Sequence, residues 1–197
     1  MDRAGALPGR RAASVIRRRT ERRRPWTRMG TVGAAAHVFY ELLSGVAMPF
    51  ASRTGPRAAA TFWAGSTMTA YHQAARQPEA RDNVFAALNG LYLSAVIAHF
   101  LSWPRTTRRG LPWLIEGEGL TGPVIAPYNA ILHVSAVAAI GGLVENRRGR
   151  AWGALVPVVT VPWLLREQRR EFGRLLVQAQ KHPGWWNRRL RSRVTPA

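Results

Sequence analysis

The sequence predicts an all-α fold, a polytopic transmembrane helix bundle with four spans and one further short helix. Three observations lead to this prediction. Long stretches in the middle of the chain carry no charged residue, and strongly basic segments lie on both sides of them. Tryptophans also gather at the edges of the uncharged stretches, as they do at the headgroup level of membrane proteins. These are Trp26, Trp103, Trp113, Trp152, Trp163, Trp185 and Trp186.

The four spans follow from the lengths of the uncharged stretches. A helix needs roughly 20 apolar residues, within a range of about 17–25, to cross the hydrocarbon of a bilayer. Residues 29–52 contain a single charge, Glu41, and residues 58–75, 83–104 and 119–144 contain none. Surface helices of soluble proteins alternate an apolar face with a polar one. The absence of a charged face in these stretches therefore favours membrane spans.

The last uncharged stretch, AWGALVPVVTVPWLL at residues 151–165, is shorter and contains Pro157 and Pro162. We expect it to form a re-entrant or interfacial helix. In an alternative arrangement, residues 58–75 lie at the membrane surface and residues 151–165 span instead. The first arrangement leaves five arginines outside and the second leaves seven, so the positive-inside rule favours the first by a small margin.

The charge distribution divides the chain into a membrane domain and two tails. The formal net charge is +19, and the only lysine is Lys181. We expect residues 1–29 to form a basic, disordered cytoplasmic tail, although Met29 is an alternative translation start. Residues 30–165 are expected to form the transmembrane domain, and residues 166–197 a basic amphipathic cytoplasmic tail. The bias toward arginine is typical of high-GC bacteria, so the expected location is a bacterial cytoplasmic membrane.

The basic tails are expected to bind membrane lipid. Anionic headgroups attract each basic residue near the surface by about 1 kcal/mol, which explains the tails more economically than nucleic acid does. A protein partner or a second copy of the chain stays open as an alternative. The predicted lipid contacts are Arg17, Arg18, Arg19, Arg22, Arg23, Arg24, Arg169, Arg170, Trp185 and Trp186.

The segment HVFYE places His37 and Glu41 inside the first predicted span. A spacing of four puts both side chains on one face of a helix. A polar group without a partner in lipid costs several kcal/mol, so polar side chains of different spans should face one another. Ionisable residues within a span indicate an intramembrane site. The candidate ligand- or proton-binding residues are His37, Glu41, His72, Asn89, Tyr92, His99, Asn129 and His133.

Depth along the spans predicts how these side chains pair. Glu41 and His133 should meet at the midplane of the membrane. His37 and His72 should meet in its inner half, while His99 should lie apart in the outer half. Such pairs form a functional site or act only as hydrogen-bonded packing between helices, and the sequence leaves both readings open.

The sequence assigns no metal site, because it contains neither HExxH nor HxxxH, and it leaves any cofactor unknown. Residues 117–122 match GxGxxG, but Glu118 would face the phosphate and no clear strand precedes the motif. We expect Pro123 to open a membrane helix instead, with Thr121 as its cap. Glu116 and Glu118 would then form an acidic external rim.

Two blocks, HVFYELLSGVAMPFASRTGP at 37–56 and EGEGLTGPVIAPYNAILHVSA at 116–136, resemble small uncharacterised multi-span integral membrane proteins of actinobacteria. The resemblance covers residues 30–165 and implies no activity.

The function expected from these features is that of a carrier- or channel-like membrane protein with an intramembrane His/Glu site. The alternative is a non-catalytic membrane subunit or scaffold whose basic ends bind anionic lipid or a partner protein. An enzyme is disfavoured, because the chain has no cysteine, no GxSxG motif and only two aspartates, Asp2 and Asp82. No catalytic residue is assigned.

Overall fold

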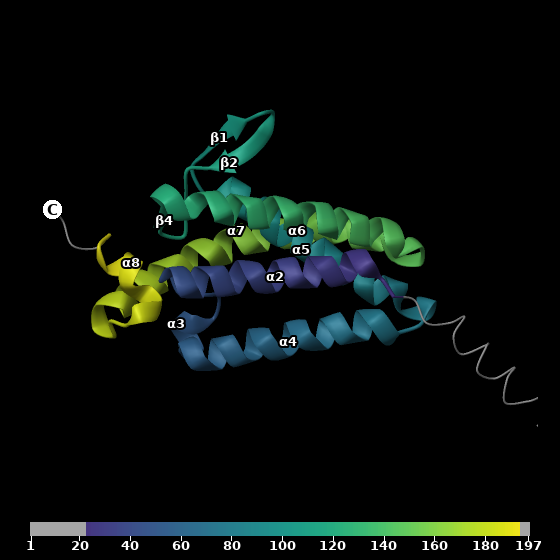
Figure 1. Ribbon diagram of the computed structural model, residues 1–197, viewed down its shortest axis with the longest axis horizontal. Coiled ribbons are helices and arrows are strands. Elements are labelled where there is room, and N and C mark those ends of the chain that lie inside the picture. The colour runs from purple at the N-terminus through teal and green to yellow at the C-terminus, as the bar shows by residue number, and fades with distance from the viewer. Residues whose placement is uncertain (1–22, 194–197) are drawn as a thin grey trace, which may run out of the picture.

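The computed structural model describes residues 23–193, and these are mostly helical, which confirms the predicted all-α class (Figure 1). The long helices are α2 (Pro25–Ser44), α4 (Pro56–Arg76), α5 (Asp82–Ser102), α6 (Ile125–Glu145) and α7 (Arg150–Lys181). The short helices and turns are α3 (Ala51–Thr54), α8 (Arg188–Arg191), η1 (Glu79–Arg81), η2 (Gly122–Val124), η3 (Arg147–Gly149) and η4 (Trp185–Asn187).

The helices α2, α5, α6 and α7 form a bundle, and α4 lies along its edge against α2 (Figure 1). The most extensive contacts join α5 with α7 and α2 with α6. Successive long helices alternate in direction, so residue 23 and α8 lie at opposite ends of the bundle (Figure 1). The predicted arrangement placed both ends of the chain on one side, because both tails are strongly basic.

The boundaries of α2 follow from local sequence signals. Pro25 stands at the start of the helix, where its fixed φ is compatible with the first turn and its missing N–H costs nothing. Gly45 ends the helix with a φ of 82°, and its N–H bonds to the carbonyls of Glu41 and Leu42. Glycine is the usual residue at this left-handed position. The helix therefore begins four residues before the predicted boundary at residue 29.

Helix α7 corrects the prediction of a short helix at residues 151–165. Residues 151–165 do not form a separate short helix, because α7 continues through both of its prolines to Lys181. A proline inside a helix loses the hydrogen bond to the carbonyl four residues earlier, which for Pro157 is that of Gly153. This carbonyl faces Gly90 of α5, where an added Cβ atom would lie 2.4 Å from it. Helix α7 therefore packs closely on α5 next to Pro157, where the sequence predicted that a helix would end.

Two short β-hairpins between α5 and α6 were not expected from the sequence. Antiparallel pairs are formed by β1 (Arg105–Arg108) with β2 (Leu111–Leu114), and by β3 (Glu116–Gly117) with β4 (Leu120–Thr121). Each hairpin has a two-residue loop at positive φ, with 50° and 80° at Arg109 and Gly110, and 49° and 94° at Glu118 and Gly119. Positive φ at both positions is the pattern of a type I′ turn. The GxGxxG motif thus contains a tight turn.

The bundle end where α2 begins is held by Arg24, which is fully buried. Its guanidinium donates hydrogen bonds to Asn146 Oδ1 at 2.8 Å and to Asp82 Oδ1 at 2.9 Å. It also donates to the carbonyls of residues 77 and 78, each at 2.7 Å. An arginine has five N–H donors in a fixed plane, and here they join three segments of the chain. Arg24 is therefore a structural residue, and its predicted contact with lipid is wrong.

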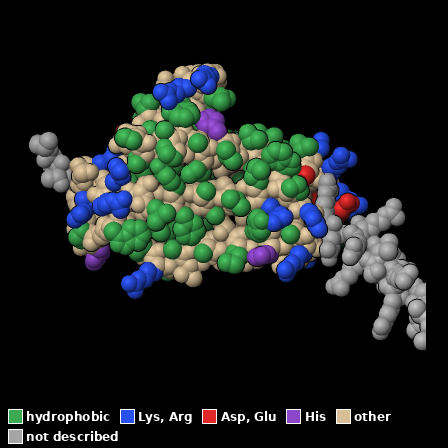
Figure 2. All heavy atoms as spheres, in the orientation of Figure 1, with side chains coloured by type: hydrophobic (Ala, Val, Ile, Leu, Met, Phe, Trp, Pro, Cys, Tyr) green, Lys and Arg blue, Asp and Glu red, His purple; other side chains and the backbone are tan. Residues whose placement is uncertain are grey.

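Apolar side chains cover much of the bundle's sides, while arginines lie mainly toward its ends and on the β1–β2 hairpin (Figure 2). On α6, Val134, Val137 and Ile140 are each more than half exposed, whereas Tyr128 and Asn129 are fully buried. Among residues 23–193, two helical stretches are long and apolar enough to cross a membrane by length and composition, so the four predicted spans are not confirmed. The two stretches are Glu79–Ser102 and Gly122–Glu145.

Candidate functional site

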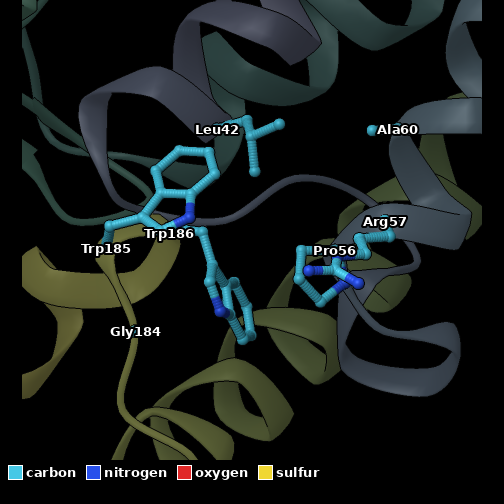
Figure 3. Close-up of a pocket in the computed structure, with 7 residues that line it drawn as sticks. All are labelled: Leu42, Pro56, Arg57, Ala60, Gly184, Trp185 and Trp186. Atoms are coloured by element: carbon cyan, nitrogen blue, oxygen red, sulfur yellow. The ribbon is translucent and has the colours of Figure 1, made fainter.

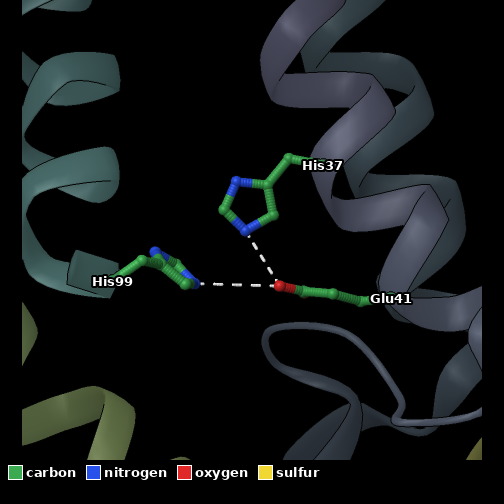
Figure 4. Close-up of side chains that lie close together, drawn as sticks. All are labelled: His37, Glu41 and His99. Atoms are coloured by element: carbon green, nitrogen blue, oxygen red, sulfur yellow. Dashed lines mark hydrogen bonds and ion pairs between the residues drawn. The ribbon is translucent and has the colours of Figure 1, made fainter. Parts of the chain in front are cut away.

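Three of the predicted site residues come together inside the bundle: His37 and Glu41 of α2, and His99 of α5 (Figure 4). His37 Nε2 lies 2.8 Å from Glu41 Oε1, and His99 Nε2 lies 3.7 Å from the same oxygen. The two imidazole rings meet edge to face, with their centroids 4.5 Å apart. The candidate ligand atoms of the three residues all lie within 4.8 Å of one another, which makes them a potential metal-binding group.

The helix geometry explains why His99 belongs to this group. Helices α2 and α5 run in the same direction (Figure 1). Glu41 comes 16 residues after the start of α2, and His99 comes 17 residues after the start of α5. At a rise of about 1.5 Å per residue, the two side chains reach the same level. The prediction that His99 lies apart is wrong, because α2 begins earlier than expected and carries Glu41 closer to the far end.

Tyr128 of α6, which the sequence analysis did not select, contacts the same carboxylate. Its hydroxyl donates a hydrogen bond to Glu41 Oε1 at 2.5 Å and lies 3.1 Å from His37 Nε2. The other oxygen of this carboxylate, Glu41 Oε2, is buried and has no hydrogen-bond partner among the described residues. Because a carboxylate oxygen can accept two hydrogen bonds, Glu41 retains unused acceptor capacity inside the protein.

Glu118 brings a second carboxylate to the group from the tip of the β3–β4 turn. Its Oε1 lies 3.3 Å from His99 Nε2, and its side chain is 16% exposed. Burial, together with the neighbouring Glu41 carboxylate, raises the pKa of Glu118 above its ordinary value. The prediction of an outward-facing rim is therefore wrong for Glu118. Glu116, in contrast, has a partly exposed side chain that forms an ion pair with Arg193.

The position of the Glu118 turn depends on the residue that follows it. Gly119 has a φ of 94°, and a Cβ atom there would lie 2.7 Å from Leu190 Cδ2 and 3.3 Å from Val46 Cγ1. Only a glycine combines this backbone conformation with such close packing. The turn therefore rests directly on α8, which fixes where Glu118 points.

Two further contacts orient the His99 ring. His99 Nδ1 lies 2.7 Å from the carbonyl oxygen of Ala95. The amide nitrogen of Gln168 on α7 lies 3.0 Å from Nδ1 and 3.1 Å from Nε2. When Nδ1 carries the proton and donates it to the Ala95 carbonyl, Nε2 presents its lone pair. The ring nitrogen that faces Glu41 and Glu118 is then an acceptor.

His133 does not pair with Glu41, so that prediction is wrong. His133 Nδ1 lies 2.8 Å from the carbonyl oxygen of Asn129, and its ring stacks on Trp113 with centroids 5.9 Å apart. The reason is a difference in level, because Glu41 lies three residues from the end of α2 and His133 eight residues from the adjacent start of α6. At about 1.5 Å per residue, a difference of five residues places the two roughly 7.5 Å apart along the bundle.

The remaining polar candidates belong to structural networks. The Asn129 side chain bonds to both the N–H and the carbonyl of Leu114, at 2.8 and 2.9 Å, and so attaches β2 to α6. Asn89 Nδ2 donates to Thr27 Oγ1 at 2.9 Å. The Tyr92 hydroxyl lies 3.1 Å from Thr31 Oγ1. His72 is exposed on α4, so its predicted meeting with His37 is also wrong.

The lipid-contact candidates fall into three groups. Arg17, Arg18, Arg19 and Arg22 lie outside the described residues. The predicted contacts of Arg23, Arg169, Arg170 and Trp185 stay open, and all four side chains are exposed. Trp186 is only 9% exposed and packs in the core, which excludes the predicted surface position for its ring.

A cavity of about 360 Å³ lies near the same end of the bundle, between α2, the start of α4 and η4 (Figure 3). Its lining is mainly apolar and does not include the His/Glu group. The lining residues are Leu42, Pro56, Arg57, Ala60, Gly184, Trp185 and Trp186. The polar group is therefore not open to solvent through this cavity.

The sequence pointed to His37, Glu41 and His99 through their position in apolar stretches, but it missed Tyr128 and Glu118. Tyrosine is common in membrane helices, and a glutamate between two glycines is typical of an exposed turn, so neither residue had a distinguishing signal. No family model, no curated protein and no solved structure matches the chain.

Proposed function

We propose that this is an integral membrane protein that binds a small cation in its interior, in the manner of a carrier. The observation that carries the proposal is the reversed polarity of its helices. Helix α6 buries Tyr128 and Asn129 and exposes Val134 and Val137. Helices on the surface of a soluble protein turn their polar face outward, whereas helices in lipid turn polar groups toward the bundle interior.

The lengths of the helices support an orientation along the membrane normal. Helices α4, α5 and α6 each have 21 residues. At about 1.5 Å per residue, each is roughly 32 Å long, close to the hydrocarbon thickness of about 30 Å. The arginines near the bundle ends (Figure 2) then lie at the level of the headgroups, where anionic lipid attracts them.

The composition of the buried group favours a cation. Glu41 and Glu118 are two carboxylates, while the groups nearest to them are His37, His99 and the Tyr128 hydroxyl. Moving negative charge out of water is costly unless a positive charge compensates it. Protons on the imidazoles or a bound metal ion would supply that charge, so the group is suited to hold and release a cation.

A flux measurement tests the carrier proposal. The full chain is reconstituted into vesicles that contain either a pH-sensitive dye or a zinc-sensitive dye, and a gradient of each ion is applied. We expect flux of one of the two ions above that of empty vesicles, with loss of the flux in Glu41→Gln. His72→Gln, at an exposed histidine of α4, is the matched control. Absence of flux for both ions in the wild type contradicts the carrier proposal.

A second candidate function is that of a non-catalytic membrane subunit or scaffold. The observation that favours it is the complete burial of Glu41 and Tyr128, because hydrogen bonds between buried polar groups hold membrane helices together without any ligand. Under this function, the wild type shows no flux, and Glu41→Gln has no effect other than on stability.

A further inference from the structure

We propose that His37, Glu41, His99 and Glu118 form a binding site for one divalent transition-metal ion of the zinc class. The inference rests on the proposed function, since it names the cation of the same site. Histidine nitrogens and carboxylate oxygens are common ligands of Zn²⁺, and four protein ligands are usual where the ion is fully enclosed.

The distances between the ligand atoms fit such an ion. With metal–ligand distances of about 2.0–2.2 Å, the corners of a tetrahedral site are separated by roughly 3.3–3.6 Å. Three separations are measured here: 2.8 Å from His37 Nε2 to Glu41 Oε1, 3.7 Å from His99 Nε2 to Glu41 Oε1, and 3.3 Å from His99 Nε2 to Glu118 Oε1. For these three of the six pairs, shifts of less than 1 Å by flexible side chains reach the ideal value. The two histidine ligand atoms lie within 4.8 Å of each other.

The charge of the site selects a divalent ion. Two carboxylates and two neutral imidazoles carry a net charge of −2, which a divalent cation neutralises. A neutral site avoids the cost of an uncompensated buried charge. The buried, unpartnered Glu41 Oε2 gives this carboxylate a second oxygen for the ion, in addition to the oxygen that already accepts from Tyr128.

The surrounding contacts resemble those that support known metal ligands. Metal-binding histidines usually donate their other ring N–H to a carbonyl or carboxylate, which fixes the ring and its tautomer. The Ala95 carbonyl oxygen, 2.7 Å from His99 Nδ1, is placed to accept this hydrogen bond. The Tyr128 hydroxyl holds Glu41 in the same way. Ala95 and Tyr128 are therefore positioning residues of the proposed site.

His133 is a second buried histidine, but it lies outside the proposed site. Its Nε2 is also buried without a hydrogen-bond partner among the described residues, yet its ring lies against Phe100 and Trp113. Within residues 23–193, no carboxylate forms an ion pair with His133, so its ring has no companion ligand there. The metal site is inferred from the combination of ligand atoms, and an isolated buried histidine does not meet that condition.

The route of the ion follows from exposure. Glu118 is the most accessible of the four side chains, at 16%, while Glu41 has no exposed surface. Glu118 also lies in a turn at the end of the bundle, outside the two stretches long enough to span a membrane. The ion would therefore reach the interior by way of Glu118 and then engage the histidines and Glu41.

Equilibrium binding of Co²⁺ and Zn²⁺ to the purified full chain in detergent tests the inference without requiring transport. Tetrahedral Co²⁺ absorbs visible light, so its binding is followed directly and Zn²⁺ is measured by displacement. We expect one ion per chain. We expect His99→Gln and Glu118→Gln each to weaken binding by at least about tenfold, since even supporting residues of metal sites change affinity by 10–100-fold. His72→Gln and His182→Gln, at exposed histidines, should bind as the wild type does.

Circular dichroism and gel filtration establish that each variant is folded, and Glu118→Gln is the safest of them because its side chain reaches the surface. The inference is overturned when the wild type shows no saturable binding, or when folded His99→Gln and Glu118→Gln bind as tightly as the wild type. Glu41-dependent proton flux without metal binding removes this inference and leaves the carrier proposal standing. Metal binding without flux of either ion supports this inference and contradicts the carrier proposal.

Discussion

At the scale of single residues, the interior is organised around the carboxylate of Glu41. It receives the hydroxyl of Tyr128 and the ring nitrogen of His37 on one oxygen. A carboxylate in such a position is tolerated only because its neighbours can donate hydrogen bonds to it. The effect of replacing Glu41 on stability should therefore depend on whether the new side chain can still accept these hydrogen bonds.

Glu41→Gln and Glu41→Leu separate these cases. Glutamine keeps a carbonyl oxygen for the Tyr128 hydroxyl, so we expect a small change in the free energy of unfolding. Leucine leaves Tyr128 and His37 without their acceptor, at a cost of about 1–3 kcal/mol for each stranded polar group. Thermal unfolding in detergent, followed by circular dichroism, measures both. Equal destabilisation by the two substitutions would show that hydrogen bonding to Glu41 is not what matters.

Arg24 provides a second test at this scale, with its neighbour as control. Arg24→Gln removes the salt bridge to Asp82 and most of the bonds to the 77–78 carbonyls. Breaking a buried ion pair typically costs about 3–5 kcal/mol, so we expect the melting temperature to fall markedly. Arg23→Gln, at an exposed position, should leave it unchanged. A similar small effect from both substitutions contradicts the structural role of Arg24.

At the scale of elements, the contact between α5 and α7 depends on a glycine. A Cβ atom at Gly153 of α7 would lie 2.5 Å from the carbonyl oxygen of Ala86 on α5 and 2.6 Å from Leu143 Cδ2. Small residues let helix backbones approach one another closely, which is the main source of packing energy between helices in lipid. The α5–α7 pair should therefore be sensitive to any side chain at this position.

Gly153→Val tests this packing, and Gly173→Val on the same helix is its control, because a Cβ atom at Gly173 meets nothing within 4 Å. Both substitutions carry the same intrinsic helix preference. Overpacking a close contact costs about 1–3 kcal/mol or more, so we expect Gly153→Val to lower thermal stability and the control to have little effect. The stability of the two variants is compared in the same detergent, and equal values count against the close α5–α7 contact.

The helices could be predicted from the sequence, whereas their ends and partners could not. Uncharged stretches located α2, α4, α5 and α6, since composition alone reveals where a chain avoids charge. The start of α2 has a local signal in Pro25, but the count of charged residues did not use it. The continuation of α7 past Pro157 goes with close packing on α5, which composition does not contain. The approach of Glu118 to His99 depends on a turn conformation and on contact with α8, and thus on residues far apart in the sequence.

At the scale of the whole molecule, the direction of the helices fixes which loops share a side. The β1–β2 hairpin and α8 lie at one end of the bundle, and η1 lies at the other end with residue 23 (Figure 1). The proposed orientation along the membrane normal turns these ends into opposite sides of a membrane. This differs from the topology predicted from arginine counts, in which the last segment and residues 1–29 share a side.

Single cysteines measure this topology cleanly, because the natural chain contains none. Thr107→Cys lies in the hairpin, Ser192→Cys follows α8, and Ala80→Cys lies in η1, and all three positions are exposed. We expect an impermeant thiol reagent, applied to one side of sealed vesicles, to label the first two together and the third only from the other side. Labelling of residues 80 and 192 from one side would exclude the proposed orientation.

The contact between the Glu118 turn and α8 also determines when the centre is completed during biosynthesis. The chain leaves the ribosome from its N-terminal end, so His37, Glu41, His99 and Glu118 all emerge before Leu190. The turn that carries Glu118 packs on Leu190, which is made 72 residues later. Until Leu190 is made, the turn that carries Glu118 lacks the surface on which it packs. The proposed metal site would therefore be completed only after translation has passed α8, and an ion that arrived earlier would meet an incomplete set of the proposed ligands.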